Sequence, residues 1–319
     1  MRHIIESQQF DRKMLERVFN TADFLEHNPI QSLSGKIMAT LFYEPSTRTR
    51  LSFESAMLRL GGKVITTENA KEFSSAAKGE TLEDSIRVIS SYADVIVLRH
   101  HETGAAKRAS LVSKIPIINA GDGRGQHPTQ AILDLYTIKR EKGKIDGLRV
   151  AMVGDLKNGR TVRSLSYVLG KYKNISITFV SPKELAIGRD IIAYLKRHDV
   201  NVKETDDMAA AIKTADVVYQ TRIQKERFED PKEYEKFKGV YKINNEVLKK
   251  MKPNAIVMHP LPRVDEIAVE VDSSPKAVYF KQAYYGFLVR KALLHLVFNS
   301  ENTVDTIEDY IKTKIKALY

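Results

Sequence analysis

The sequence contains no cysteine. This absence excludes disulfide bonds, thiolate catalysis and cysteine-ligated zinc within the chain, so any metal would need histidine or carboxylate ligands. Long apolar runs are also missing, because no stretch approaches the roughly 18 residues that cross a bilayer. The opening residues, MRHIIESQQFDRK, hold too short an apolar stretch for a signal peptide. We therefore expect a cytoplasmic protein that does not associate with membranes.

Internal repeats, low-complexity tracts and an obvious flexible linker are absent as well. Hydrophobic residues make up 43% of the chain and charged residues 29%, close to the averages for folded soluble proteins. This composition argues against a disordered or collagen-like chain. At about 150 residues per domain, the length of 319 residues favours two domains.

Acidic residues are outnumbered by basic ones. There are 51 Lys and Arg against 40 Asp and Glu, a formal net charge of +11, which raises nucleic-acid binding as one interpretation. The basic residues do not form a tail, however, and most are interleaved with acidic ones, as in QKERFEDPKEYEKFKG. Solvated helix faces or an anionic small substrate are the more ordinary explanations of the charge. We therefore predict no nucleic-acid partner.

Short β-branched runs alternate with amphipathic segments along the whole chain. The predicted strands are residues 36–43, 63–68, 94–99, 116–120, 148–155, 176–181, 201–205, 216–221 and 255–260. Helical patterns between them include residues 11–27, 51–60, 81–92, 128–143 and 189–198. Continuous apolar strands separated by helices indicate parallel sheets that are covered on both faces. The predicted fold class is α/β, with two domains that each contain a parallel β-sheet flanked by helices.

One polar, glycine-containing stretch, EKGKIDGLR (141–149), lies between two groups of strands of similar size. We place the domain boundary there, which gives a first domain over 1–140 and a second over 141–283. The apolar pattern at 280–298 is too long for a strand and predicts a helix. We expect the C-terminal helices, 284–319, to return to the first domain.

The segment FYEPSTRTRLSFESAMLRLGG (42–62) is the first one with chemical content. An apolar strand ends at Tyr43, and Ser46 suits the N-cap of the amphipathic helix that follows. Backbone N–H groups and the positive end of the helix dipole attract an anion at such a position. Further donors follow on the same turn, namely Thr47, Arg48, Thr49 and Arg50. A capped surface helix is the plainer alternative, but two arginines at a helix start oppose the dipole, so we predict a phosphate site.

Three more positions have a chemical interpretation that competes with a structural one. His127, beside Pro128 at a helix start, can donate to a substrate carbonyl, although a lone histidine there is more often a capping or buried residue. Arg99 follows a strand at its carboxyl end, where ligands of α/β sheets bind, although an ion-paired surface arginine is equally plausible alone. HPLPR (259–263) exposes backbone carbonyls, because proline donates no hydrogen bond and interrupts the strand.

The segment GDLKNGRT (154–161) nearly fits the phosphate loop G-x-x-x-x-G-K-[ST], with Arg160 where lysine should stand. A nucleotide-hydrolysing enzyme with this loop would also need a later strand that ends in an aspartate for magnesium. The predicted strands at 216–221 and 255–260 do not end that way. A P-loop-like nucleotide-binding enzyme therefore stays open as a remote alternative.

Taken in order, these motifs resemble those of the aspartate and ornithine carbamoyltransferases. STRTR resembles the carbamoyl-phosphate signature, and QHPTQAILDL (126–135) resembles the second motif of the family. Later motifs of the aspartate branch are matched by SSAAKGETLEDS (74–85), GDLKNGRTVRSL (154–165), TRIQKER (221–227) and MHPLPRVDEI (258–267). The cysteine-containing HCLP and the SMG motif of ornithine enzymes are absent. The resemblance covers nearly the whole chain and favours aspartate, with ornithine or another amino acid as the alternative.

The resemblance implies transfer of the carbamoyl group of carbamoyl phosphate to the α-amine of L-aspartate, in pyrimidine biosynthesis, without metal or organic cofactor. The implied catalytic residues are Arg48, Thr49, Lys78, Arg99 and His127. The implied carbamoyl-phosphate ligands are Ser46, Thr47, Arg48, Thr49, Ser74, Lys78, Arg99, His127, Gln130, Pro260 and Leu261. The implied aspartate ligands are Lys78, Arg160, Arg222 and Gln224.

Quaternary structure is implied by the resemblance alone. In the enzymes that this chain resembles, the residues corresponding to Ser74 and Lys78 reach into the active site of the neighbouring subunit. This implies a homotrimer with shared active sites. By itself the segment reads as an exposed loop, and the sequence leaves open whether a separate regulatory chain binds.

Overall fold

The computed structural model describes residues 3–73, 78–224, 228 and 230–299. The chain forms two compact units. Unit 1 comprises Met1–Ile132 and Tyr285–Tyr319, and unit 2 comprises Leu133–Tyr284. The chain therefore passes between the units twice, each time within a helix. The boundary at 140/141 that we expect from the sequence separates two substrate-binding domains, which is a different division from these compact units. That boundary stays a prediction.

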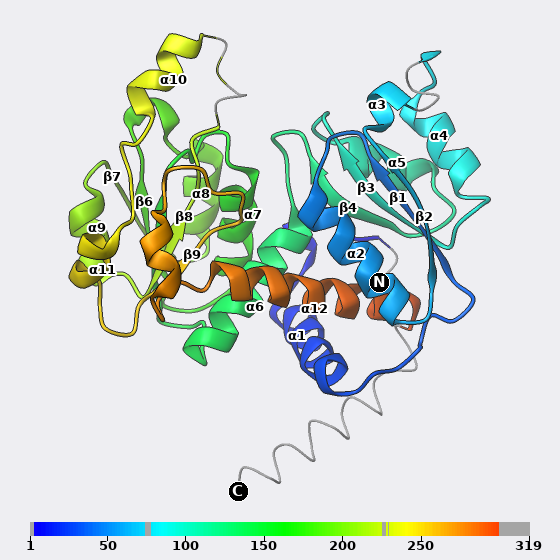
Figure 1. The fold of residues 1–319 in the computed structure, drawn as a ribbon, viewed down its shortest axis with the longest axis horizontal. Helices are drawn as coiled ribbons and strands as arrows, with labels where there is room; N and C mark the ends of the chain where they lie inside the picture. Colours follow the sequence, from blue (N-terminus) through cyan, green and yellow to red (C-terminus); the bar gives the residue numbers. More distant parts are fainter. Residues whose placement is uncertain (1–2, 74–77, 225–227, 229, 300–319) are drawn as a thin grey trace, which may run out of the picture. The chain divides into compact units, whose positions relative to one another are not determined.

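Unit 1 contains a four-stranded sheet and its helices (Figure 1). Its first elements are η1 (Ser7–Gln9), α1 (Arg12–His27), β1 (Ile37–Phe42), α2 (Thr47–Arg59), β2 (Lys63–Glu68) and α3 (Ala70–Phe73). They are followed by α4 (Leu82–Ile89), β3 (Val95–His100), α5 (Ala105–Val112), β4 (Ile117–Asp122) and α6 (Pro128–Lys142), which continues into unit 2.

The strand order in unit 1 is β2-β1-β3-β4, and all pairs are parallel. Strands β1, β3 and β4 are almost continuously buried, whereas the edge strand β2 is mostly exposed or half-buried. Burial on both faces explains why β3 reads as the unbroken apolar run VIVL in the sequence. One face of the sheet packs on α4 and α5, through Ile86 and the alanines of α5.

Helix α12 (Tyr279–Phe298) belongs to unit 1 from Tyr285 onward. Three polar side chains fasten it there. Arg290 Nη1 donates to Ser52 Oγ at 2.8 Å, and Lys291 Nζ donates to the carbonyl of Leu25 at 2.9 Å. Ser32 Oγ and His295 Nδ1 are 2.7 Å apart. The expected return of a C-terminal helix to the first domain is confirmed for this helix, and the remainder of that expectation, at 300–319, lies outside the described residues.

Unit 2 contains a five-stranded sheet, also flanked by helices (Figure 1). Its first elements are β5 (Arg149–Val153), α7 (Arg160–Leu169), β6 (Ser176–Val180), η3 (Lys183–Leu185), α8 (Arg189–Arg197) and β7 (Asn201–Thr205). They are followed by α9 (Met208–Thr214), β8 (Val217–Gln220), α10 (Pro231–Phe237), α11 (Asn245–Lys250), β9 (Ile256–Met258) and η5 (Val269–Ser273).

The strand order in unit 2 is β7-β6-β5-β8-β9, again with parallel pairs throughout. Its buried core includes Val153, Val180, Val218 and Val257, one from each of four neighbouring strands. Several helices begin at an acidic or amide N-cap; Asp207, for example, accepts a hydrogen bond from Ala210 N–H at 2.9 Å. Such local signals explain where the helices that cover the sheet start.

The predicted fold class is confirmed: two domains, each with a parallel sheet flanked by helices. All nine predicted strands are present, with ends displaced by two residues or fewer. Helix α2 starts at Thr47, directly after the predicted N-cap Ser46 and four residues before the apolar pattern at 51–60, since its first turn is polar. Among the described residues, no helix is long and apolar enough to span a membrane.

Candidate active site

Most of the predicted site residues lie at the carboxyl edges of the two sheets. In unit 1 they lie at or after the ends of β1, β3 and β4, which are neighbours, and in unit 2 they follow β5, β8 and β9, which are also neighbours. In each sheet the chain adds strands first toward one edge and then toward the other. The change of side falls between β1 and β3 in unit 1 and between β5 and β8 in unit 2. Ligands of open α/β sheets bind outside the carboxyl ends of strands at such reversals. Each unit therefore places one group of predicted residues at a position suited to a ligand.

The N-terminus of α2 forms the first part of the site in unit 1. Arg50 N–H makes a backbone hydrogen bond to the carbonyl of Ser46 at 3.0 Å, so the preceding amides of the first turn point out of the helix end. Ser46 occupies the N-cap, as predicted, but its side chain makes no capping hydrogen bond. Its hydroxyl therefore does not compete with a ligand for these amides.

The two arginines of this turn have different roles. Arg48 is exposed at the helix start, whereas Arg50 pairs with Glu68 on β2 at 2.9 Å. Arg50 also donates to Thr66 Oγ1 at 3.4 Å. The expectation that Arg50 adds a donor to the phosphate site is wrong, because its guanidinium is directed to the edge strand. Arg48 and the buried Thr49 remain at the helix end.

Arg99 lies near the end of β3 and is largely buried, with 14% of its side chain exposed. Its Nη1 donates to the carbonyl of Ala120 on β4 at 3.3 Å, and its Nη2 lies 3.5 Å from Glu44 Oε2. The carbonyl and the carboxylate hold the guanidinium at the carboxyl edge of the sheet. Arg99 is thus neither a freely solvated surface residue nor part of the apolar core.

His127 and Gln130 lie at the start of α6, where Pro128 is the first helical residue. Both side chains are buried, and His127 Nδ1 is 3.4 Å from Thr129 Oγ1. If this hydroxyl donates to Nδ1, the ring proton resides on Nε2, which can then act as a donor. The loop before His127 is held by Asp122, which accepts hydrogen bonds from the amides of Gly104 and Gln126.

His100 is a buried neighbour of Arg99 that the sequence interpretation passed over. It stacks on His101, with ring centroids 4.3 Å apart, and its Nδ1 accepts the N–H of Glu102 at 3.0 Å. Burial, reinforced by the charge of His101, lowers the pKa of His100 to about 4. His100 is therefore neutral near pH 7 and adds no charge beside Arg99.

His100, His101 and Glu102 also form the one group among the described residues whose ligand atoms approach each other closely enough for a metal ion. Two of these three side chains already accept hydrogen bonds from protein donors. Glu102 Oε2 accepts a hydrogen bond from Arg108 at 2.8 Å, and His100 Nδ1 accepts a backbone amide. The cluster is therefore better described as a set of contacts that close the loop after β3.

In unit 2, the loop from Gly154 to Gly159 connects β5 to α7. The amides of Leu156 and Lys157 donate to the carbonyl of Leu185 at 3.1 and 3.0 Å, and the amide of Asn158 donates to Asp155 Oδ1 at 3.0 Å. A phosphate-binding loop uses such consecutive amides to surround its ligand. Here protein oxygens occupy them, so the geometry argues against the P-loop-like alternative.

Asp155 is a buried carboxylate that joins two parts of the site. It accepts hydrogen bonds from both the main-chain and side-chain nitrogens of Asn158, and from the backbone N–H of Gln224. It thereby links the loop that leads into Arg160 with the segment after β8 that holds Arg222. Burial raises its pKa despite these bonds. Sequence reasoning missed this residue because its only signal was an aspartate after an apolar strand.

Arg160 is the first residue of α7, and Arg222 and Gln224 follow β8; all three are half-buried. The adjacency of β5 and β8 and the bonds of Asp155 bring their segments together. Pro260 and Leu261 follow β9, the next strand. The charge of Arg222 contributes to lowering the pKa of His259, after the larger effect of burial, which places Arg222 near the β9 loop as well.

Two further predicted residues, Ser74 and Lys78, fall between α3 and α4 in the sequence. Lys78 is exposed, in the turn that precedes α4. Ser74 lies outside the described residues.

Comparison with known proteins agrees with this geometry. Residues 2–140 match the family model for the carbamoyl-phosphate-binding domain of aspartate/ornithine carbamoyltransferases, and residues 146–297 match that for the Asp/Orn-binding domain. The chain belongs to the aspartate/ornithine carbamoyltransferase family.

Individual relatives point to the aspartate branch. Aspartate carbamoyltransferase 2, chloroplastic, of Pisum sativum is 58% identical over 300 residues, which are 92% of this chain and 78% of the relative. The catalytic subunit of M. jannaschii aspartate transcarbamoylase is 53% identical in structural alignment, with a TM-score of 0.87 over 94% of this chain and 99% of that one. Trypanosoma cruzi aspartate transcarbamoylase in complex with carbamoyl phosphate and aspartate is 39% identical, with a TM-score of 0.88 over 93% and 96%.

Proposed function

We propose that this chain transfers the carbamoyl group of carbamoyl phosphate to the α-amine of L-aspartate, giving N-carbamoyl-L-aspartate and phosphate for pyrimidine biosynthesis. The observation that carries the choice of amine is the link that Asp155 makes between the segments of Arg160 and Arg222. Two planar guanidinium groups suit the two carboxylates of aspartate. The same groups repel the cationic side chain of ornithine.

Unit 1 supplies the ligands of carbamoyl phosphate. Amides of the first turn of α2, with the side chains of Ser46, Thr47, Arg48 and Thr49, hold the phosphate. Charge-assisted hydrogen bonds of this kind contribute about 1.5–3 kcal/mol each. The absence of acidic residues from the first turn of α2 supports this assignment.

Arg99, Thr49 and His127 polarise the carbamoyl carbonyl. Gln130 and the backbone carbonyls of Pro260 and Leu261 hold the carbamoyl NH2 group, because carbonyl oxygens accept the hydrogens that this group donates. The substrate is therefore oriented by donors at its oxygen and acceptors at its nitrogen.

The reaction begins when the neutral α-amine of aspartate attacks the carbamoyl carbon. Negative charge then develops on the carbonyl oxygen, where Arg99, Thr49 and His127 stabilise it; loss of one such donor typically lowers the rate about 10²–10³-fold. The bond from carbon to the phosphate oxygen breaks, and the electron pair leaves with phosphate. The departing phosphate takes the amine proton, so no separate protein base is required.

The positive net charge of +11 is consistent with two anionic substrates. Electrostatic steering accelerates the capture of anions by basic proteins. We therefore keep the prediction that nucleic acid is not a partner and that neither metal nor organic cofactor takes part in the chemistry.

Lys78 is assigned to the phosphate and aspartate of a neighbouring subunit in a homotrimer, together with Ser74. The exposure of Lys78 supports this arrangement, because an exposed side chain is accessible to a neighbouring subunit. A cytoplasmic location is also kept as a prediction, and binding of a regulatory chain is left open.

The test is steady-state turnover by the purified chain, measured as phosphate release and ureido product with L-aspartate, L-ornithine or no amine. Product that requires aspartate, without nucleotide or added metal, supports the proposal. Product with ornithine alone would overturn the roles of Arg160, Arg222 and Gln224. Absence of product with either amine would overturn the proposal as a whole.

A further inference from the structure

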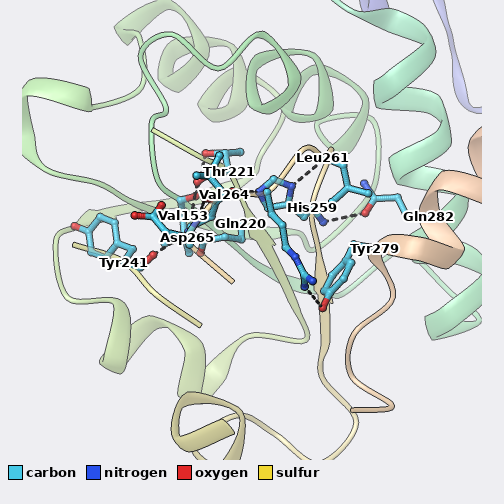
Figure 2. A network of polar contacts seen from close by, with 12 residues as sticks. Val153, Gln220, Thr221, Tyr241, His259, Leu261, Val264, Asp265, Tyr279 and Gln282 are labelled. Atoms are coloured by element: carbon cyan, nitrogen blue, oxygen red, sulfur yellow. Dashed lines mark hydrogen bonds and ion pairs between the residues drawn. The ribbon is translucent and has the colours of Figure 1, made fainter. Parts of the chain in front are cut away.

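The loop that follows β9 is held from within by a buried imidazole and carboxylate. His259 Nε2 lies 2.7 Å from Glu266 Oε1, and the two side chains are 1% and 7% exposed. The opposite ring nitrogen, Nδ1, accepts the N–H of Leu261 at 2.8 Å. Figure 2 shows the hydrogen bonds that join His259 to Leu261 and to Gln282.

These contacts define the protonation of the pair. Since Nδ1 accepts the amide of Leu261, the ring proton of neutral His259 resides on Nε2 and is donated to Glu266. The second oxygen, Glu266 Oε2, accepts the amides of Val264 and Asp265 at 3.1 and 3.2 Å. The carboxylate of Glu266 thus accepts hydrogen bonds from the imidazole of His259 and from two backbone amides in the far half of the loop.

The base of the loop is anchored by further buried residues of unit 2. The backbone N–H of His259 donates to Gln282 Oε1 at 2.9 Å, and Gln282 Nε2 donates to Asp134 Oδ1 at 2.6 Å. Tyr219 OH on β8 donates to the other oxygen of Asp134 at 2.7 Å. The backbone of His259 is therefore held, through Gln282 and Asp134, by β8 and by the residues of α6 and α12 that belong to unit 2.

The loop needs such support because of its backbone conformation. Leu261 has a φ of +52°, which lies in the left-handed region that residues other than glycine and asparagine rarely adopt. Conformations of this kind persist where the surrounding structure holds them, and they gather at functional sites. The amide of Leu261 that binds His259 is part of the peptide unit that carries the carbonyl of Pro260. Fixing this amide fixes the direction of that carbonyl.

We propose that His259 and Glu266 are positioning residues, which aim the carbonyl of Pro260 so that it accepts a hydrogen bond from the carbamoyl NH2 group. The inference rests on the proposed function, which supplies that substrate. Neither side chain touches the substrate; both act through the backbone of the loop.

The ionisation of the pair is compatible with this role. Burial lowers the pKa of His259, and the charges of Arg222 and Arg263 act in the same direction, against the effect of Glu266. The pKa of Glu266 is lowered although burial opposes this, because His259 and loop amides hydrogen-bond the carboxylate. A neutral imidazole beside an ionised carboxylate is therefore the stable state near pH 7.

The test separates the two ring nitrogens. His259→Asn keeps a side-chain acceptor near the position of Nδ1, within reach of the Leu261 amide, whereas His259→Gln places its amide near Nε2 and leaves the Leu261 amide without its acceptor. We expect His259→Gln to lower kcat/KM for carbamoyl phosphate about 100-fold, the effect of a displacement of about 1 Å, and His259→Asn to lower it less than about 10-fold. Glu266→Gln is a second variant, for which we expect a loss between these two.

Equilibrium binding provides the readout that a purely structural role would not change. Inorganic phosphate lacks the carbamoyl group, so its dissociation constant should stay at the wild-type value in His259→Gln and Glu266→Gln, whereas that of carbamoyl phosphate rises. His295→Asn in unit 1 is a matched control, because it alters a buried histidine that is also bonded through Nδ1. We expect it to leave the affinities for both ligands unchanged.

The possible results are distinguishable. Equal weakening of phosphate and carbamoyl phosphate, or equal activity of His259→Asn and His259→Gln, would overturn the positioning role while wild-type turnover still supports the proposed function. If His259→Gln does not fold, the comparison of the two ligands in Glu266→Gln decides. Absence of turnover in the wild type would instead refute the proposed function itself.

Discussion

The bonds of Asp155 lead to a prediction in which activity and stability respond separately. In the wild type, nitrogens of Asn158 and Gln224 donate hydrogen bonds to the carboxylate of Asp155. Asp155→Asn preserves the size of the side chain but replaces one accepting oxygen with an NH2 group, which cannot accept these bonds. At least one charge-assisted hydrogen bond, worth about 1.5–3 kcal/mol, is lost. The loop before Arg160 and the segment after β8 then lose their common anchor. A displacement of about 1 Å lowers the rate about 100-fold.

The effect on folding is expected to be small, because burial raises the pKa of Asp155. A raised pKa means that the ionised carboxylate is less favourable in the folded chain than in the unfolded chain, and a neutral amide removes that cost. We therefore expect the free energy of unfolding of Asp155→Asn to change by no more than about 1 kcal/mol. KM for aspartate should rise about 10- to 100-fold, while the affinity for phosphate stays the same.

Asp216 offers a matched control at the opposite end of the same strands. Its carboxylate accepts the amide of Arg149 at 2.8 Å and pairs with Lys252 at 2.7 Å, at the amino end of β5 and β8. Hydrogen bonds from Lys252 and the amide of Arg149 hold its pKa low although burial opposes this. Asp216→Asn should therefore lower the unfolding free energy by about 1–3 kcal/mol without changing KM. Denaturant unfolding and initial-rate kinetics check both variants, and an unchanged KM in Asp155→Asn would refute the reasoning.

Three further predictions follow from the site and from the buried histidines. Arg222→Ala should raise KM for aspartate at least about 10-fold with phosphate affinity unchanged, and calorimetry showing that both ligands weaken equally would contradict the division between units. In the proposed homotrimer, mixing Lys78→Ala with Arg48→Ala subunits should restore part of the wild-type rate, and no gain after subunit exchange would argue against shared sites. Burial is the main cause that lowers the pKa values of His100 and His295 to about 4. Between pH 6.5 and 4 the unfolded chain therefore binds more protons than the folded chain, so the free energy of unfolding should fall as the pH drops, by at most about 3 kcal/mol per histidine. Urea titrations across this pH range measure the change, and a flat profile would refute the prediction.

Much of the fold could be predicted because parallel, buried strands leave a strong signal. β3 and β5 read as continuous apolar runs, and their ends were predicted within two residues. The same reasoning located the N-terminus of α2 and the helix start after His127, since proline and polar capping residues mark them. Motif order could then predict which strand ends carry the candidate ligands.

Contacts between segments distant in sequence could not be predicted in the same way. Arg50 looked like a phosphate ligand because it shares a turn with Arg48, and only the pairing of β1 with β2 brings Glu68 to it. Asp155 and Glu266 are acidic residues in loops, where an exposed position is the ordinary expectation. Their burial depends on which strands become neighbours, and the local pattern does not encode that.

The central claim is tested most directly by competition in a single reaction mixture. The purified chain is given isotopically labelled carbamoyl phosphate with equal concentrations of L-aspartate and L-ornithine, and labelled products are identified by mass spectrometry. Sites built to bind specific polar groups reject analogues that lack them by large factors. We predict N-carbamoyl-L-aspartate in at least about 100-fold excess over carbamoylated ornithine. Comparable amounts of the two products, or an excess of carbamoylated ornithine, would contradict the account.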